Sequence, residues 1–403
     1  LGDEHFSLAN AIFINESLVA PHTHTSFDAF RVAGNRVLAL DWSTAITEHA
    51  LRPPLWLAMQ LASSLQTMLL NGQQYEGSGS DFLHALCSAS GSLSQFQFSM
   101  AFRATTIIPP CFWQLTSLHT LISKRDFKDD DELRTKYEFR IGGQMPASLE
   151  HVTNLYRFAL GDDNVKDGKY ELVGDGGHLI HGSLPLLPAG MKWLEIVSMK
   201  NVSGQIPVEY CQNAALSTLR IQGTSIRGPV PSCLGGVNNT ALYSIQLTDN
   251  PLLGGPLPWG AWFSPRRRGA ARIRIMRLYK NDFVGPALPA DFPDDCSLTR
   301  VTLSGNTKLT GPVPNNITKC RHLEWLSMKK MNLTGQLPVS LCGMCALGFT
   351  SFYENPNLEL IPGWDQTCKD LFCGRVLKCP DKADRIDSFK VDGINNYERE
   401  RDC

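Results

Sequence analysis

Three segments of the sequence repeat one pattern: IRIMRLYKNDFVG (273–285), LTRVTLSGNTKLTG (298–311) and LEWLSMKKMNLTG (323–335). Their first residues, Ile273, Leu298 and Leu323, lie 25 residues apart. Apolar residues follow at the fourth and sixth positions, and Asn281 and Asn306 occupy the ninth. Self-similarity at a fixed period of this length indicates a solenoid in which each repeat is one structural unit.

Each position of the pattern has a physical role. Apolar and polar residues alternate from the fourth to the sixth position as in a short strand, so the apolar side chains point inward. The ninth-position asparagine can bond the backbone of the turn, and stacked repeats are expected to form an amide ladder. We therefore expect an α/β leucine-rich-repeat solenoid, with a curved parallel sheet on its concave face and short helical, 3-10 and loop segments on its convex face.

The repeats are predicted to fill residues 35–362, with the earlier ones more degenerate than the later ones. Because neighbouring repeats bury each other's apolar faces, the array is expected to be one elongated domain with a cap at each end. Residues 1–34 lack the pattern and are assigned to an N-terminal cap, and residues 363–403 to a disulfide-rich C-terminal cap. About twelve repeats are predicted, with first positions near residues 35, 65, 93, 118, 155, 194, 216, 242, 273, 298, 323 and 347.

Two repeats are overlong because they contain insertions, at residues 126–140 and 162–181. Both leave the repeat between the strand and the following turn, so they are expected to emerge side by side on one rim. Insertions that share a face often mark a binding surface, but loop closure is cheap enough that solvated loops also occur without a function. The sequence leaves both interpretations open.

The chain combines 12 cysteines with five Asn-x-Ser/Thr sequons. Together these features favour an oxidising secretory route and an extracellular or cell-surface location. The sequence starts at Leu1 and has no run of 18 apolar residues, which we interpret as an ectodomain cut from a longer protein. A membrane anchor would then lie outside the given sequence. The candidate glycosylation sites are Asn15, Asn201, Asn238, Asn316 and Asn332.

Cysteines at matching positions of neighbouring repeats are predicted to bond, since stacking places such residues about 5 Å apart. In order of decreasing agreement in position, the predicted pairs are Cys296 with Cys320, Cys87 with Cys111, and Cys211 with Cys233. Cys345 shares the column of Cys296, so a bond between Cys320 and Cys345 is left open. The other cysteines expected in disulfides are Cys342, Cys368, Cys373, Cys379 and Cys403.

Charge and motifs argue against several function classes. The 38 basic and 39 acidic residues nearly cancel, so nothing global favours nucleic acid. The sequence lacks the His-Glu-x-x-His, Gly-x-Ser-x-Gly and Gly-x-x-x-x-Gly-Lys-[Ser/Thr] motifs, and its ten histidines form no visible constellation. We therefore predict a protein that is not an enzyme and has no metal or cofactor.

Seven Gly-x-x-Pro motifs with an apolar third residue make a family resemblance specific. They begin at Gly143, Gly182, Gly204, Gly228, Gly255, Gly311 and Gly335. Residues 35–362 resemble the plant-type leucine-rich-repeat class, which includes receptor-kinase ectodomains, polygalacturonase-inhibiting proteins and kinetoplastid promastigote surface antigens. Plant members usually open with a cap that bears cysteine and tryptophan, which residues 1–34 lack, so the chain looks most like the protist surface proteins. The resemblance implies adhesion or ligand capture by the solenoid.

The pattern also identifies the strand side chains that point away from the core. They are mostly small or neutral in the N-terminal half and become basic and aromatic in the C-terminal half. Arginine, tryptophan and tyrosine are enriched at interaction hot spots. Alternatively, charged side chains only keep the sheet soluble, or the C-terminal cap covers the aromatic ones. The candidate ligand-binding residues are Arg220, Arg274, Arg277, Tyr279, Arg300, Trp325, Lys329, Phe349 and Tyr353.

We therefore expect a non-enzymatic glycoprotein, secreted or at the cell surface, that binds a protein or glycan ligand through the C-terminal half of its concave face. Arg277, Tyr279, Arg300 and Trp325 are expected to form the centre of this surface on three successive strands. Two alternatives stay open. One is a structural subunit that self-associates into a surface coat or filament, and the other is an inhibitor of a secreted hydrolase.

Overall fold

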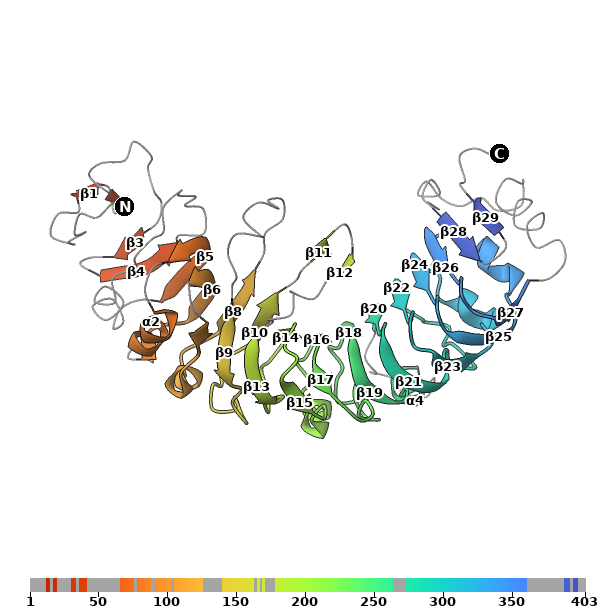
Figure 1. Cartoon of the computed structure of the whole chain (residues 1–403), viewed down its shortest axis with the longest axis horizontal. Helices are drawn as coiled ribbons and strands as arrows, with labels where there is room; N and C mark the ends of the chain where they lie inside the picture. The colour runs from red at the N-terminus through yellow and green to blue at the C-terminus, as the bar shows by residue number, and fades with distance from the viewer. Residues whose placement is uncertain are drawn as a thin grey trace. The chain divides into compact units, whose positions relative to one another are not determined.

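The computed structural model describes residues 66–75, 78–87, 91–102, 105–125, 140–162, 178–263 and 273–360, together with short strands outside these ranges. The chain divides into two compact units, residues 1–202 and 203–403. Both consist of parallel sheets with few helices, as predicted for an α/β leucine-rich-repeat solenoid (Figure 1). No helix among the described residues is long and apolar enough to span a membrane.

In the first unit each repeat contributes a strand to a first sheet, and three repeats add a strand to a second sheet. The first-sheet strands lie in the order β3 (Phe30–Ala33), β4 (Arg36–Asp41), β5 (Thr67–Tyr75), β6 (Gln95–Phe102), β8 (Thr120–Arg125), β10 (Arg157–Asp162) and β14 (Trp193–Val197). Among these strands, β3 and β4 pair antiparallel. The second sheet holds β7 (Thr106–Ile107), β9 (Ile141–Gln144) and β13 (Leu179–Ser183), and the helices are α2 (Gly79–Leu86) and the 3-10 helix η3 (Pro110–Gln114).

The second unit repeats this plan more regularly. Its first-sheet strands are β16 (Thr218–Gln222), β18 (Ser244–Thr248), β20 (Ile275–Arg277), β22 (Arg300–Thr302), β24 (Trp325–Ser327), β26 (Phe349–Ser351), β28 (Ser388–Val391) and β29 (Ile394–Tyr397). On the other side of the repeats, β15 (Val202–Gly204) pairs with β17 (Ser225–Ile226). A separate five-stranded sheet follows, with β19 (Asn250–Pro256), β21 (Asn281–Pro286), β23 (Lys308–Gly311), β25 (Asn332–Gln336) and β27 (Asn357–Glu359). Its helices are η4 (Val208–Gln212), α4 (Trp259–Trp262), η5 (Asn315–Lys319) and η6 (Val339–Gly343).

Strand pairing corrects two repeat starts. Leu40 pairs with Met68, the fourth residue of the repeat that starts at 65, so the first repeat starts at Val37 rather than at 35. Phe158, the fourth residue of the repeat that starts at 155, pairs with Leu194. Leu194 is therefore also a fourth residue, and its repeat starts at Met191 rather than at 194. The sequence was ambiguous because Met191, Leu194, Ile196, Val197 and Met199 are all apolar, so the pattern fits two registers.

The ninth-position asparagines form the predicted ladder. Asn306 is fully buried, and its Nδ2 donates to the carbonyl oxygens of Leu278 and Leu303 at 2.8 and 2.6 Å. Its Oδ1 accepts from the backbone N–H of Asn281 at 3.2 Å. In the next repeat Met331 takes this position, so the ladder is interrupted there. Equivalent side-chain bonds are made by Asn250, Asn281 and Asn355.

The Gly-x-x-Pro turns use the backbone freedom of glycine. Gly143 and Gly311 have φ angles of 117° and 96°, which side chains with a Cβ rarely adopt. A Cβ on Gly143 would also lie 2.9 Å from the carbonyl oxygen of Ile108. Several 3-10 helices then start directly after the proline, as η5 does after Pro314. The turn therefore ends the second-sheet strand and leads the chain into the short helix.

The structure contains the three disulfides that the repeat positions predict. They join Cys296 to Cys320, Cys87 to Cys111 and Cys211 to Cys233, with Cα atoms 4.7, 5.7 and 5.6 Å apart. Because Cys320 bonds Cys296, the alternative bond to Cys345 is excluded. Cys342 and Cys345 each take part in a disulfide as well. Cys368, Cys373, Cys379 and Cys403 lie outside the described residues.

The two insertions begin at neighbouring strand ends. β8 and β10 finish at Arg125 and Asp162, which pair with each other. Most residues of the insertions lie outside the described part of the chain, apart from a hairpin of β11 (Val165–Lys166) and β12 (Lys169–Tyr170). Of the predicted caps, the structure describes β28 and β29 and, near the N-terminus, β3 and the hairpin of β1 (Ile12–Ile14) and β2 (Ser17–Val19). The cap boundaries therefore stay predictions.

Candidate ligand-binding site

Parallel pairing in the second unit aligns outward side chains into rows that cross the first sheet. The first residues of β20, β22, β24 and β26 pair with one another, and so do the third residues. Both sets point away from the core because strand side chains alternate. The first row is Ile275, Arg300, Trp325 and Phe349, the second is Arg277, Thr302, Ser327 and Ser351, and the third, two residues further on, is Tyr279, Ser304, Lys329 and Tyr353. We call these twelve residues the strand face.

Arg300, Trp325 and Phe349 form a continuous stack across three strands. The rings of Trp325 and Phe349 are stacked with centroids 3.8 Å apart and planes inclined by 15°. The guanidinium carbon of Arg300 lies 5.0 Å from the centroid of the Trp325 ring. Because β22 and β26 flank β24, the arginine and the phenylalanine cover opposite faces of the indole. All three side chains are half-buried, and the stack fixes their orientation before a ligand arrives.

The third row contains a second cation–π pair, and the two serines of the second row are nearly buried. The Lys329 ammonium lies 5.0 Å from the centroid of the Tyr353 ring. Ser327 and Ser351 of the second row are 5% and 1% exposed, and Ser327 shares a 2.9 Å hydrogen bond with Ser304. A ligand on this surface therefore meets the larger side chains of the first and third rows before it reaches the serines.

Not every predicted site residue belongs to this surface. Arg220 is buried, with 7% exposure, and its Nη2 donates to Gln222 Oε1 at 2.8 Å, so the expectation of an exposed arginine is wrong there. Arg274 immediately precedes β20 and is exposed, with its guanidinium carbon 5.8 Å from the centroid of the Tyr243 ring. Arg277 and Tyr279 are half-buried members of the strand face.

The rim beside the third row carries ion pairs between neighbouring repeats. Lys280 pairs with Asp249 at 3.0 Å, and Lys330 with Glu354 at 3.3 Å. Burial raises the pKa of Asp249 although the hydrogen bond and charge of Lys280 oppose this. The strand face itself carries three cations and no carboxylate, so its own side chains make it positively charged.

The first unit contains a similar arginine–tryptophan pair that the sequence reading missed. Arg157 and Trp193 pair across β10 and β14, with the guanidinium carbon 4.9 Å from the centroid of the Trp193 ring. Glu195, on the same side of β14, is buried with 2% exposure. The repeat start at 194 placed Trp193 outside the strand and Glu195 off the outward positions. With the repeat starting at Met191, Trp193 and Glu195 occupy the third and fifth positions, which point outward from the strand.

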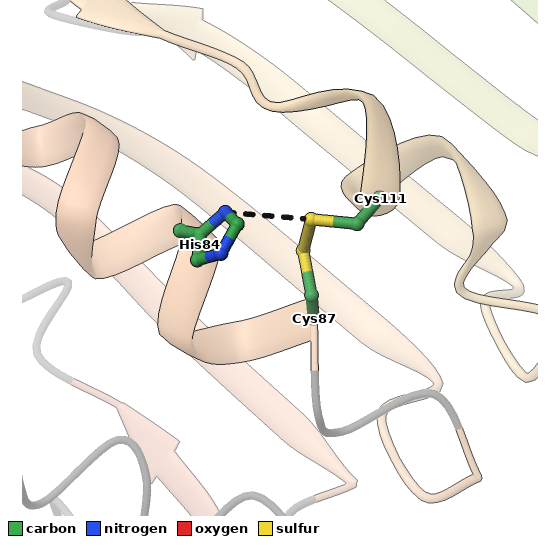
Figure 2. A group of neighbouring side chains, drawn as sticks. All are labelled: His84, Cys87 and Cys111. Atoms are coloured by element: carbon green, nitrogen blue, oxygen red, sulfur yellow. Dashed lines mark hydrogen bonds between the residues drawn. A yellow bond between two sulfur atoms is a disulfide. The ribbon is translucent and has the colours of Figure 1, made fainter.

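A His/Cys cluster in the first unit is not a thiolate metal site in this structure. Figure 2 shows His84 of α2 directed at Cys111, with its Nδ1 3.7 Å from the sulfur. Cys87 and Cys111 are joined by a disulfide, so neither sulfur is a thiolate that could bind a metal (Figure 2). The cluster is a disulfide between α2 and η3 with an imidazole beside it.

The sequons differ in the environment of their asparagine side chains. Asn201 is exposed, as are Asn238, which donates to Gln212, and Asn332, whose Oδ1 accepts from Asn357. Asn316 is half-buried, and its Nδ2 donates to Asp291 Oδ1 at 2.6 Å and to the Ala290 carbonyl at 3.2 Å. Asn15 lies outside the described residues. Glycan attachment at Asn316 would require its amide to leave these acceptors.

Comparison with known proteins supports the fold. No family model matches the sequence, and no curated protein matches it significantly. The crystal structure of PEPR1–AtPEP1 is 17% identical, with a TM-score of 0.53, and the match covers 83% of this chain and 51% of that one. A TDR receptor structure is 18% identical, with a TM-score of 0.54 and coverage of 80% and 52%. The chain thus spans about half the length of these leucine-rich-repeat ectodomains. The likeness gives no support to the narrower resemblance to kinetoplastid surface antigens.

Proposed function

We propose that the protein is a non-enzymatic extracellular binding protein that captures a protein or glycan ligand on the strand face. The observation that carries this proposal is the Arg300–Trp325–Phe349 stack. Large aromatic and arginine side chains on an outward sheet face cost solubility unless they serve a contact. Their prior stacking lowers the entropy that a ligand would otherwise have to offset on binding. The matching PEPR1 structure, which holds AtPEP1, is consistent with this role.

Disulfides and accessible sequons support the extracellular part of the proposal. Three disulfides join neighbouring repeats, and disulfides of this kind persist in oxidising compartments. We expect glycans on Asn201, Asn238 and Asn332, and low occupancy at Asn316 because its amide is engaged. Mass spectrometry of glycopeptides from natively produced protein checks this. If no sequon carries a glycan, the argument for secretion is removed.

Truncation of the stack tests the binding function. We expect Arg300→Ala and Trp325→Ala each to weaken capture of the ligand that the wild type retains from a cell-surface protein array or glycan array. The expected loss is about 2 kcal/mol or more if these side chains are hot spots. Both variants should fold, because neither side chain points into the core. Equilibrium binding and the melting temperature are measured together.

Arg321→Ala is the matched control. Arg321 is an exposed arginine in the turn just before the strand that carries Trp325. It should leave binding unchanged, since it lies off the strand face. Undiminished binding by the Arg300→Ala/Trp325→Ala double variant would move the site to the insertions or the caps. Size-exclusion chromatography separates this function from the filament alternative, which requires self-association of the purified chain.

A further inference from the structure

The stack bears on the choice between a glycan and a protein ligand. A pyranose ring binds an aromatic side chain by laying its C–H groups on the flat face of the ring. In the strand face, Arg300 and Phe349 already cover the two faces of Trp325. The Tyr353 ring has Lys329 over one face. The large aromatic side chain at the centre of the surface is therefore closed to sugar stacking.

What remains accessible on the Trp325 ring is its edge, which is positively polarised because the negative charge of the π system lies on the faces. The guanidinium of Arg300 and the ammonium of Lys329 add N–H donors to the same surface. Arg277 adds a third cation, and no strand-face residue is acidic. Ring edges and cations both attract oxygen anions. The surface therefore favours carboxylates.

The positions of the cations favour a polypeptide as the source of those carboxylates. By strand register, Arg277 and Arg300 lie one strand and two residues apart, so their Cα atoms are about 8 Å apart. Arg300 and Lys329 lie one strand and four residues apart, so their Cα atoms are about 14 Å apart. The three cations thus lie in three different rows of the strand face, at unequal intervals. A carboxylated polysaccharide repeats its charge at a fixed interval. An extended peptide carries acidic side chains on flexible stems to alternate sides.

We propose that the strand face binds an acidic polypeptide segment in an extended conformation. The segment crosses β20, β22, β24 and β26 above the second row, and its Asp and Glu side chains reach Arg300 on one side and Lys329 on the other. This inference rests on the proposed function and names the ligand class of the same surface.

Fluorescence anisotropy with defined probes tests the ligand class. The probes are a labelled peptide of alternating glutamate and serine, its glutamine counterpart, oligogalacturonate as the carboxylated glycan and a cello-oligosaccharide as the neutral one. We expect the glutamate peptide to bind most tightly, and about tenfold or more above the glutamine peptide, because charged hydrogen bonds are the stronger ones. Its affinity should fall as salt is added, since the surface is solvent-accessible.

Variants assign the binding to the stack. Arg300→Gln should weaken the glutamate peptide about tenfold, and Arg300→Lys should restore part of the loss, because lysine keeps the charge without the planar stack. Trp325→Leu should also weaken binding, since it removes the ring that orients Arg300. Arg321→Gln is the control of equal charge change and should bind like the wild type.

The possible results separate the two proposals. A glycan that binds the wild type more tightly than the glutamate peptide, and loses affinity in Trp325→Leu, overturns the polypeptide assignment while the strand face stays the site. A glutamate peptide that does not bind, or binds Arg300→Gln as well as the wild type, also overturns it. The proposed function itself fails only if the ligand found on the array binds the strand-face variants as tightly as it binds the wild type.

Discussion

Replacing Asn306 by alanine tests whether the asparagine ladder holds the repeats together. Asn306 Nδ2 donates to two backbone carbonyls, and its Oδ1 accepts one N–H, all in a fully buried position. After truncation, Leu278 O would still accept from Asn281 Nδ2 at 2.8 Å. The Leu303 carbonyl and the Asn281 N–H would lose the partners that Asn306 provides. The variant therefore leaves two backbone groups orphaned rather than three.

The two orphans set the size of the effect. A buried polar group left without its partner costs about 1–3 kcal/mol, so Asn306→Ala should destabilise the second unit by about 3 kcal/mol. Asn306→Asp should cost more, because a buried carboxylate would face the carbonyl oxygens to which the amide now donates. Met331, which occupies the ninth position of the next repeat, shows that an apolar residue can be accommodated there. The cost of Asn306→Ala should therefore come from the lost hydrogen bonds and not from placing an apolar side chain at this position.

Urea unfolding followed by circular dichroism measures the stability, and hydrogen exchange of the Asn281 amide measures the local effect. The control is Asn357→Ala, because Asn357 is exposed and its Nδ2 donates to the side chain of Asn332. It should change the stability by less than about 0.5 kcal/mol. If Asn306→Ala unfolds at the same urea concentration as this control, with unchanged exchange at Asn281, the ladder does not stabilise the fold.

Three further predictions address other parts of the second unit. Replacing Cys296 and Cys320 by serine should cost about 3 kcal/mol, measured by thermal unfolding, because the disulfide closes a loop of 24 residues. Lys330→Gly should raise the free energy of unfolding, measured with urea, by about 0.5 kcal/mol, since φ of 56° strains a side chain with a Cβ and the lost ion pair is exposed. The raised pKa of Asp249 means that the folded state holds the proton more tightly, so wild-type stability should fall as pH rises above the ordinary value of 3.8. Melting curves of Asp249→Asn should lack this pH-dependent loss.

The second unit could be predicted closely because its repeats keep most positions of the pattern. Ile273, Leu298 and Leu323 fix the register at intervals of 25 residues, and asparagine marks the end of most strands. The Cys296–Cys320 disulfide follows from the same register, since nearly equal positions in successive repeats stack at about one strand spacing. One periodic constraint thus determines strands, core and covalent links together.

Where the pattern is ambiguous, the prediction failed. The apolar run from Met191 to Met199 satisfies two registers, and only pairing between strands distinguishes them. This single ambiguity hid Trp193 and Glu195. The stacking of Arg300, Trp325 and Phe349 could not be predicted from the sequence for a different reason. Register places Arg300, Trp325 and Phe349 side by side, but side-chain rotamers decide whether the rings stack or splay.

The recurrence of an arginine beside a tryptophan in both units follows from the register and has a consequence for stability. Arg157 with Trp193 and Arg300 with Trp325 occupy the same pattern position in two consecutive strands of the first sheet. Residues at this position contribute no side chain to the core and none to the asparagine ladder, so substitutions there leave the main stabilising contacts in place. Binding and stability should therefore vary independently, and an Arg300→Gln/Asn306→Ala double variant should show both losses as the sum of the single effects.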